Sequence, residues 1–161
     1  MLSKFNIISM NESFNEHPLG KIGVIIYFTG CSKACSGNPC INNGIPCHNP
    51  DLFNKKDSDY KTWDELKSEF DTYFNDELLN IDSVIFCGGE PCDSIEELNS
   101  LSKLIHDNYP NVEQVLFTHY TDLPKSVDTK YITWIKHGEW GKYQWYVNLK
   151  TKEQKVLYNA N

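Results

Sequence analysis

The sequence predicts an α/β fold with a mainly parallel sheet and a ligand site at the carboxyl ends of its strands. Two observations lead to this prediction. Short apolar segments typical of strands alternate with amphipathic helical segments, and polar segments rich in glycine and cysteine begin where the strands should end. Ligands of parallel α/β folds collect at the carboxyl ends of strands, so these polar segments should meet at one rim. The 161 residues suit one domain, and we expect a single domain over residues 1–161.

The strands are expected where short apolar runs lie between turn residues. They are residues 5–8, 24–28, 84–86, 115–117 and 131–135. Further along the chain, residues 144–149 and 155–158 are joined by the polar segment 151–153, which predicts a C-terminal antiparallel hairpin.

Two helices are predicted by capping boxes, each followed by an apolar stripe. Thr62, with Glu65 three residues later, begins a helix that should reach about Leu79. Ser94, with Glu97 in the same relative position, begins the second helix. The buried stripes should be Leu66, Phe70, Tyr73 and Phe74 in the first helix and Leu98, Leu101, Leu104 and Ile105 in the second.

Charge and hydropathy exclude two classes of partner. The net charge is -7, and all fifteen basic residues are lysines, so the arginine fork that reads guanine or grips phosphate is absent. We therefore expect no nucleic-acid partner. No run of about 18 apolar residues predicts a membrane span. Residues 1–8 lack the pattern of an export signal, and a cytoplasmic protein is expected.

Four of the six cysteines fall within a short polar stretch directly after the strand at residues 24–28. They are Cys31, Cys35, Cys40 and Cys47. In a reducing compartment such a cluster indicates metal ligation rather than disulfides. Zinc would use all four thiolates in a tetrahedron, and an iron-sulfur cluster takes the same ligand type, so the spacing leaves both open.

A second motif follows the strand at residues 84–86. Gly88 and Gly89 would let the backbone approach a ligand closely, and Glu90 would accept hydrogen bonds from a ligand amino group. His119, at the end of the strand at residues 115–117, is a further candidate for contact with a cofactor or substrate. Cys87 and Cys92 flank the Gly-Gly-Glu-Pro turn and are expected to serve packing.

Three motifs together resemble the radical S-adenosylmethionine (SAM) superfamily, and within it the small activating proteins of anaerobic ribonucleotide reductase. They are Tyr27-Phe28-Thr29-Gly30-Cys31-Ser32-Lys33-Ala34-Cys35, Cys47-His48-Asn49-Pro50-Asp51-Leu52 and Gly88-Gly89-Glu90-Pro91. Residues 116–120 and 134–140 are similar to later segments of the same family. The likeness covers roughly residues 22–140.

The resemblance implies a radical SAM domain that forms an incomplete parallel β/α barrel, because a full eight-stranded barrel needs about 200 residues or more. It implies a 4Fe-4S cluster on three cysteines, with the fourth iron open to SAM. Cys31 and Cys35 would supply two of these ligands. Cys47 is favoured as the third because His48-Asn49-Pro50 follows it, and Cys40 is the alternative.

The resemblance also assigns the SAM site. Gly88, Gly89 and Glu90 would receive the methionyl group, and Thr118 would contact the ribose. Lys136, expected just past the fourth main strand, would bind the methionyl carboxylate. No catalytic residue beyond the cluster and the SAM site is implied.

The implied function is that of a radical SAM activase, an oxidoreductase that cleaves SAM reductively and forms a glycyl radical on a large partner, anaerobic ribonucleoside-triphosphate reductase. A donor such as flavodoxin or ferredoxin would supply the electron. Two alternatives stay open. One is a radical SAM enzyme that acts on a nucleoside or deazapurine precursor, and the other is a non-enzymatic zinc module.

Overall fold

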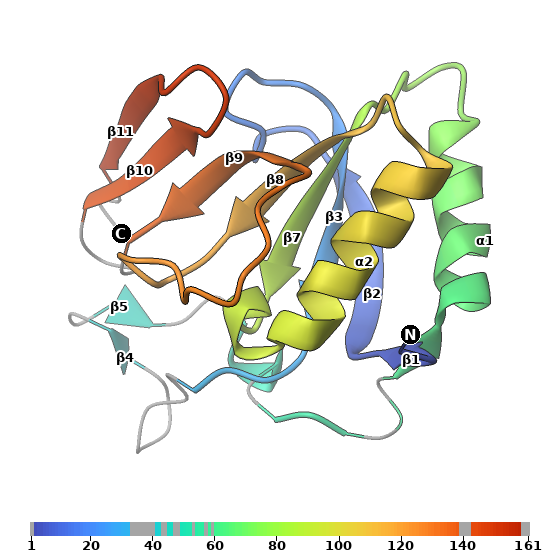
Figure 1. The fold of residues 1–161 in the computed structure, drawn as a ribbon, viewed down its shortest axis with the longest axis horizontal. Coiled ribbons are helices and arrows are strands. Elements are labelled where there is room, and N and C mark those ends of the chain that lie inside the picture. The colour runs from blue at the N-terminus through green and yellow to red at the C-terminus, as the bar shows by residue number, and fades with distance from the viewer. Residues whose placement is uncertain are drawn as a thin grey trace.

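The computed structural model describes residues 2–32, 41–42, 45–46, 49–52, 54–56, 58, 60–138 and 143–158. Figure 1 shows a twisted central sheet with helices α1 (Trp63–Phe74) and α2 (Ile95–Asn108) on the same side of it. No helix in these ranges is long and apolar enough to cross a membrane.

The main sheet has seven strands in the order β11-β10-β9-β8-β7-β3-β2. Their bounds are Ile7–Ser13 (β2), Gly23–Phe28 (β3), Ser83–Gly88 (β7), Glu113–Phe117 (β8), Ile132–His137 (β9), Tyr143–Asn148 (β10) and Gln154–Tyr158 (β11). Strands β3, β7, β8 and β9 pair in parallel, and the flanking strands β2, β10 and β11 pair antiparallel. The predicted α/β class with a mostly parallel sheet is therefore confirmed, as is the hairpin of β10 and β11.

Short elements complete the fold. Strand β1 (Lys4–Phe5) pairs with β6 (Lys61–Thr62), and β4 (Ile41–Asn42) pairs with β5 (Ile45–Pro46). The 3-10 helix η1 (Pro50–Leu52) lies between β5 and β6, and η3 (Pro91–Asp93) lies between β7 and α2. The single strand expected at residues 5–8 is thus split between β1 and β2.

Lys136 does not lie past the fourth main strand, as the sequence suggested, but inside β9. The strand runs on to His137 because antiparallel pairing with β10 continues there, with Lys136 opposite Tyr146 and His137 opposite Trp145. An apolar run in the sequence does not predict this extension of β9, because the partner strand supplies the hydrogen bonds.

Helix α1 begins as predicted and ends earlier than predicted. The side chain of Thr62 accepts a hydrogen bond from the Glu65 N–H, and the Glu65 carboxylate accepts one from the Thr62 N–H. The expected continuation to Leu79 is wrong, because Asn75 caps the helix and the Asp76 carboxylate accepts the Leu79 N–H.

Helix α2 begins after Ser94 without the predicted capping box. The Ser94 side chain makes no capping bond, and its hydroxyl instead accepts a hydrogen bond from the Asn6 side-chain amide at 2.9 Å. Asn6 is fully buried next to β2 and donates also to the Thr29 carbonyl. The Ser94 hydroxyl, which the local pattern predicted to cap the helix, therefore forms a tertiary contact instead.

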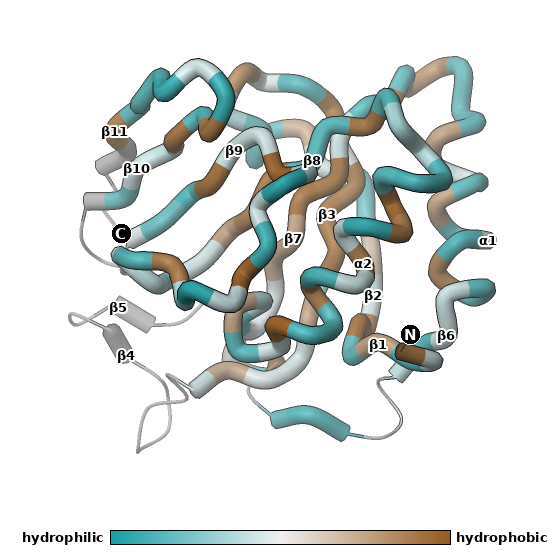
Figure 2. The backbone as a smooth tube through the Cα atoms, viewed as in Figure 1, coloured by the Kyte–Doolittle hydropathy of each residue, from teal (hydrophilic) through white to brown (hydrophobic). Residues whose placement is uncertain are grey.

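The core lies mainly between the sheet and the two helices. Strand residues Val24, Ile26, Phe28, Val84, Phe86 and Leu116 pack there with helix residues Leu66, Phe70, Leu98, Leu101 and Ile105. The opposite face of the sheet carries a smaller cluster of Ile25, Ile85, Val115, Trp134 and Tyr146 that includes no helix residue. Figure 2 shows the central strands β3 and β7 as the most continuously hydrophobic ones, as expected for strands buried on both faces.

Candidate metal centre

The loops after β3 and β7 are joined by backbone hydrogen bonds at the carboxyl end of the sheet. The Gly89 N–H donates to the Phe28 carbonyl, and the Glu90 N–H donates to the Gly30 carbonyl, both at 2.8 Å. The Gly30 N–H in turn donates to the Leu52 carbonyl at 2.7 Å. The segment that leads into the first cysteine is thus fixed against the Gly-Gly-Glu-Pro turn.

Both glycines of this turn are required by the packing of the chain against itself. Gly88 has a φ of +111°, and a Cβ added there would lie 2.4 Å from the Phe28 nitrogen. A Cβ on Gly89 would lie 2.4 Å from the Gly30 carbonyl oxygen. The close approach predicted toward a ligand is therefore also a close approach of two loops of this chain.

The Glu90 side chain ties the β7 loop to the β8 loop. It is 1% exposed and accepts hydrogen bonds from the Thr118 hydroxyl (2.7 Å), the His119 N–H (2.8 Å) and the Cys92 N–H (2.9 Å). Burial raises the pKa of Glu90, and the neighbouring His119 and the three hydrogen bonds oppose that rise. Glu90 and Thr118, predicted separately as SAM contacts, are thus in direct contact with each other.

The Asp93 side chain also joins loops of this rim through hydrogen bonds. Its carboxylate accepts the Tyr120 hydroxyl at 2.6 Å and the Ser32 N–H at 2.5 Å. Although burial acts to raise it, these hydrogen bonds hold the pKa of Asp93 below its usual value. Asp93 therefore connects the residue after Cys31 to the loop after β8.

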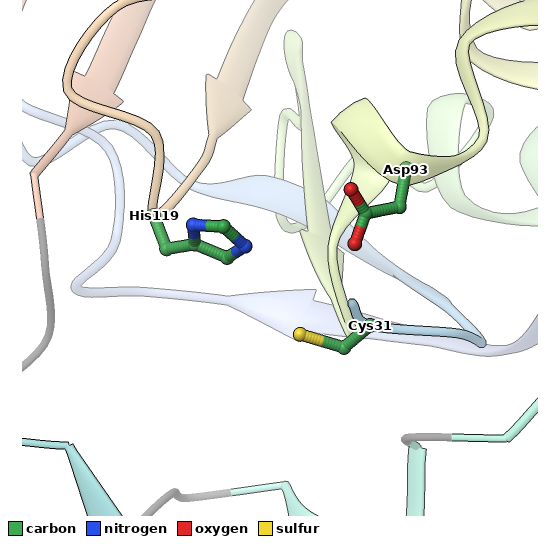
Figure 3. Close-up of side chains that lie close together, drawn as sticks. All are labelled: Cys31, Asp93 and His119. Carbon is green, nitrogen blue, oxygen red and sulfur yellow. The ribbon is translucent and has the colours of Figure 1, made fainter. Parts of the chain in front are cut away.

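Cys31, Asp93 and His119 converge at this rim. The Cys31 sulfur, one Asp93 carboxylate oxygen and one His119 ring nitrogen all lie within 4.8 Å of one another. Figure 3 shows the three side chains reaching toward a common space from the loops after β3, β7 and β8. The sequence predicted Cys31 and His119 as candidates but not Asp93, whose only signal was its position directly after the predicted rim segment that ends at Cys92.

A family model described as the 4Fe-4S single cluster domain matches residues 20–130. The chain belongs to the 4Fe-4S single cluster domain family. The matched span begins before β3 and ends before β9, so it includes the whole rim formed by Cys31, Glu90, Asp93 and His119. No curated protein matches the chain.

The described residues fit a 4Fe-4S single cluster domain. Cys31 supplies a thiol at the strand end, and His119 supplies two ring nitrogens that are buried without a hydrogen-bond partner in the described part of the chain. The other expected ligands, Cys35 and Cys47, and the alternative Cys40 lie outside the described residues. Family membership favours an iron-sulfur cluster over the zinc interpretation of these cysteines.

Two further cysteines of the 4Fe-4S single cluster domain are held neutral by burial. Burial raises the pKa of Cys87 to about 11 and that of Cys92 to about 12. Cys92 is 2% exposed within the helix-side core, and Cys87 packs against the smaller cluster on the other face. Both thiols are therefore suited to packing, as the sequence indicated, rather than to metal ligation.

Lys136 lies on the sheet face that carries no helix, beside Phe117 of the smaller cluster. Its ammonium is 4.5 Å from the centre of the Phe117 ring and forms no ion pair with any carboxylate in the described residues. Burial lowers the pKa of Lys136, and Cys87 and Glu16 oppose that shift. Thr118 and Glu90 are brought together by the fold, whereas Lys136 approaches the rim from the neighbouring strand β9.

Proposed function

We propose that this 4Fe-4S protein is a radical SAM activase. Cys31, Cys35 and Cys47 would hold the cluster, with Cys40 as the alternative to Cys47. The observation that carries the proposal is the contact between the Cys31 segment and the Gly-Gly-Glu-Pro turn at the carboxyl end of a parallel sheet. In such sheets this end is where ligands bind.

The cluster would supply an electron that cleaves the SAM sulfonium into methionine and a 5'-deoxyadenosyl radical, which takes a hydrogen atom from the substrate. The chain positions SAM for this step. The backbone of Gly88 and Gly89 and the carboxylate of Glu90 would receive the methionyl group, and Thr118 would contact the ribose. The three hydrogen bonds to Glu90 hold the turn rigid before SAM arrives, and one of them would have to open for the carboxylate to accept the methionyl amine.

Lys136 would bind the methionyl carboxylate. A half-buried ammonium without a carboxylate partner is unfavourable, and an anionic ligand would compensate for its desolvation. Within the described residues its ammonium contacts the Phe117 ring, and the groups that oppose the lowering of its pKa are Cys87 and, to a lesser extent, Glu16. This unbalanced charge supports a carboxylate ligand at the helix-free face.

The sheet would form a partial barrel whose helix-free face receives the substrate. Both described helices cover one face, and the antiparallel strands β2 and β10 flank the parallel core. An open face of this kind suits a large protein, and we propose the glycine backbone of anaerobic ribonucleoside-triphosphate reductase as the target, with flavodoxin or ferredoxin as the electron donor.

A small-molecule substrate is the second candidate. Lys136 is flanked on the same face by Phe117 and Tyr146, which pair with it from the two neighbouring strands. Two aromatic rings in contact with each other beside a cation suit a planar ligand such as a nucleoside or deazapurine precursor.

Anaerobic reconstitution with iron and sulfide, followed by reduction and incubation with SAM, tests the function. We expect visible charge-transfer absorbance and formation of 5'-deoxyadenosine. Cys31→Ala should lose both, and Cys87→Ala, which changes a thiol not expected to bind metal, should keep both. A colourless protein that holds zinc would overturn the proposal. Addition of the reductase, followed by electron paramagnetic resonance (EPR) for a glycyl radical, separates the two substrate candidates.

A further inference from the structure

We infer that His119 is a ligand of the iron that no cysteine holds while SAM is absent, and that SAM displaces it. This inference rests on the proposed function, because it assumes a cluster with one iron left open to SAM. It adds a protein ligand to that iron that neither the cysteine motif nor the family match assigns.

The first observation is the state of the His119 imidazole. Both ring nitrogens are buried, and neither makes a hydrogen bond among the described residues, although Nε2 lies 3.5 Å from a carboxylate oxygen of Glu90. The side chain is 15% exposed, so water has little access to it. A buried polar group that makes no hydrogen bond is unfavourable, so we expect a further partner for this ring.

The second observation is the position of the ring. A His119 nitrogen lies within 4.8 Å of the Cys31 sulfur, the described candidate ligand of the cluster. The imidazole therefore lies beside the position where Cys31 would hold the cluster (Figure 3).

The third observation is that other residues hold the ring in place. The His119 backbone N–H donates to Glu90, and its ring stacks on Tyr120 with 4.4 Å between ring centres. Tyr120 is itself fixed by its hydrogen bond to Asp93. These contacts thus fix the imidazole close to Cys31.

Asp93 is the other donor near Cys31, but its carboxylate is already engaged. One oxygen accepts the Tyr120 hydroxyl and the other accepts the Ser32 N–H. An iron ligand at this position would have to break one of these bonds. His119 has no such bond to lose in the described residues, so the geometry favours the imidazole.

The exchange requires no redox step. The bond between iron and the His119 nitrogen breaks, the lone pair returns to the ring, and bonds to the SAM amine nitrogen and carboxylate oxygen form. A chelating ligand with two donor atoms displaces a single imidazole readily, since only one bond has to be broken. In the absence of SAM, the imidazole would shield the iron from solvent.

The test uses pulsed EPR on the reduced cluster of the full chain, with histidine labelled by ¹⁵N. The label distinguishes a coupling to the imidazole nitrogen from a coupling to the unlabelled amine nitrogen of SAM. We expect a ¹⁵N coupling typical of an iron-bound imidazole without SAM, and its loss when SAM is added. His119→Gln should lack the coupling. His106→Gln should retain it, because His106 lies in helix α2, stacks on Tyr131 and is outside the rim.

His119→Cys keeps the inference testable if His119→Gln does not fold. A fourth thiolate in place of the imidazole should preserve the cluster absorbance and weaken SAM binding at least tenfold. A labelled wild-type cluster that cleaves SAM but shows no ¹⁵N coupling would overturn the inference and leave the proposed function standing. A coupling that persists in His119→Gln would do the same. A protein that forms no cluster or cleaves no SAM overturns the proposed function, and the inference falls with it.

Discussion

The carboxylate of Glu90, at the end of one parallel strand, accepts a 2.7 Å hydrogen bond from the hydroxyl of Thr118, at the end of the next. The same carboxylate accepts the backbone N–H groups of His119 and Cys92. One buried side chain thus holds together the two loops that carry the candidate SAM contacts and the imidazole beside Cys31.

Replacement of Glu90 tests this role. Glu90→Gln places an amide NH₂ among three donors, so at least one of them loses its acceptor. A buried donor left unpaired costs about 1–3 kcal/mol, and we expect that decrease in the free energy of unfolding, measured by urea denaturation of the metal-free protein. Glu96→Gln, at an exposed position of α2, should change stability by less than about 0.5 kcal/mol. Equal stability of the two variants would contradict the role.

Gly88→Ala tests the packing of the turn. The substitution combines a φ of +111° with a Cβ 2.4 Å from the Phe28 nitrogen. Backbone strain alone costs about 1–3 kcal/mol, so we expect a larger loss that includes the clash. Gly20→Ala is the matched control, because Gly20 also has a positive φ (+74°) but no atom within 4 Å of its added Cβ. Thermal denaturation should show the smaller loss for Gly20→Ala, and the reverse order would contradict the structure.

Lys136→Met tests the anion site. Removal of this half-buried ammonium should leave stability unchanged or higher, because partial burial already lowers the pKa of Lys136. SAM affinity should fall at least tenfold in equilibrium dialysis with the reconstituted protein. Lys125→Met, at an exposed loop position, should bind SAM like the wild type. Unchanged affinity in Lys136→Met would remove Lys136 from the site.

The acid dependence of stability tests Glu113, far from the rim. A hydrogen bond from His17 and, to a lesser extent, the charge of Lys21 lower the pKa of Glu113 in the folded state. Its contribution to stability is therefore present above the unfolded value of about 4.3 and is lost as the pH falls through the folded pKa. Glu113→Gln should be less stable than the wild type at pH 7, and urea denaturation should show the difference shrinking toward low pH. A difference that grows on acidification would contradict the contact.

The choice between the two remaining cysteine ligands is tested by separate reconstitution of Cys40→Ala and Cys47→Ala. We expect Cys40→Ala to retain iron, sulfide and visible absorbance, and Cys47→Ala to lose them. The opposite result would assign the third ligand to Cys40.

Local sequence patterns predicted much of the fold because they depend on neighbours in the chain. The capping box of Thr62 and Glu65 and the buried positions Leu66 and Leu98 follow from helix geometry, and the structure has them. The cap at Ser94 failed because Asn6, 88 residues away in the chain, takes its hydroxyl. Lys136 was predicted just past a strand but lies within β9, because β10 pairs with this part of the chain.

The sequence by itself determined the α/β class, the strands that form the parallel core, and the place of Cys31 and Gly88 at strand ends, since hydrophobic periodicity and turn residues encode these locally. Only the tertiary structure decided that Glu90 points inward to Thr118 and that Asp93 and His119 flank Cys31. The physical reason is that the register of parallel strands sets distances between residues far apart in the chain. No local pattern encodes those distances, which depend on how the strands and their loops pack together.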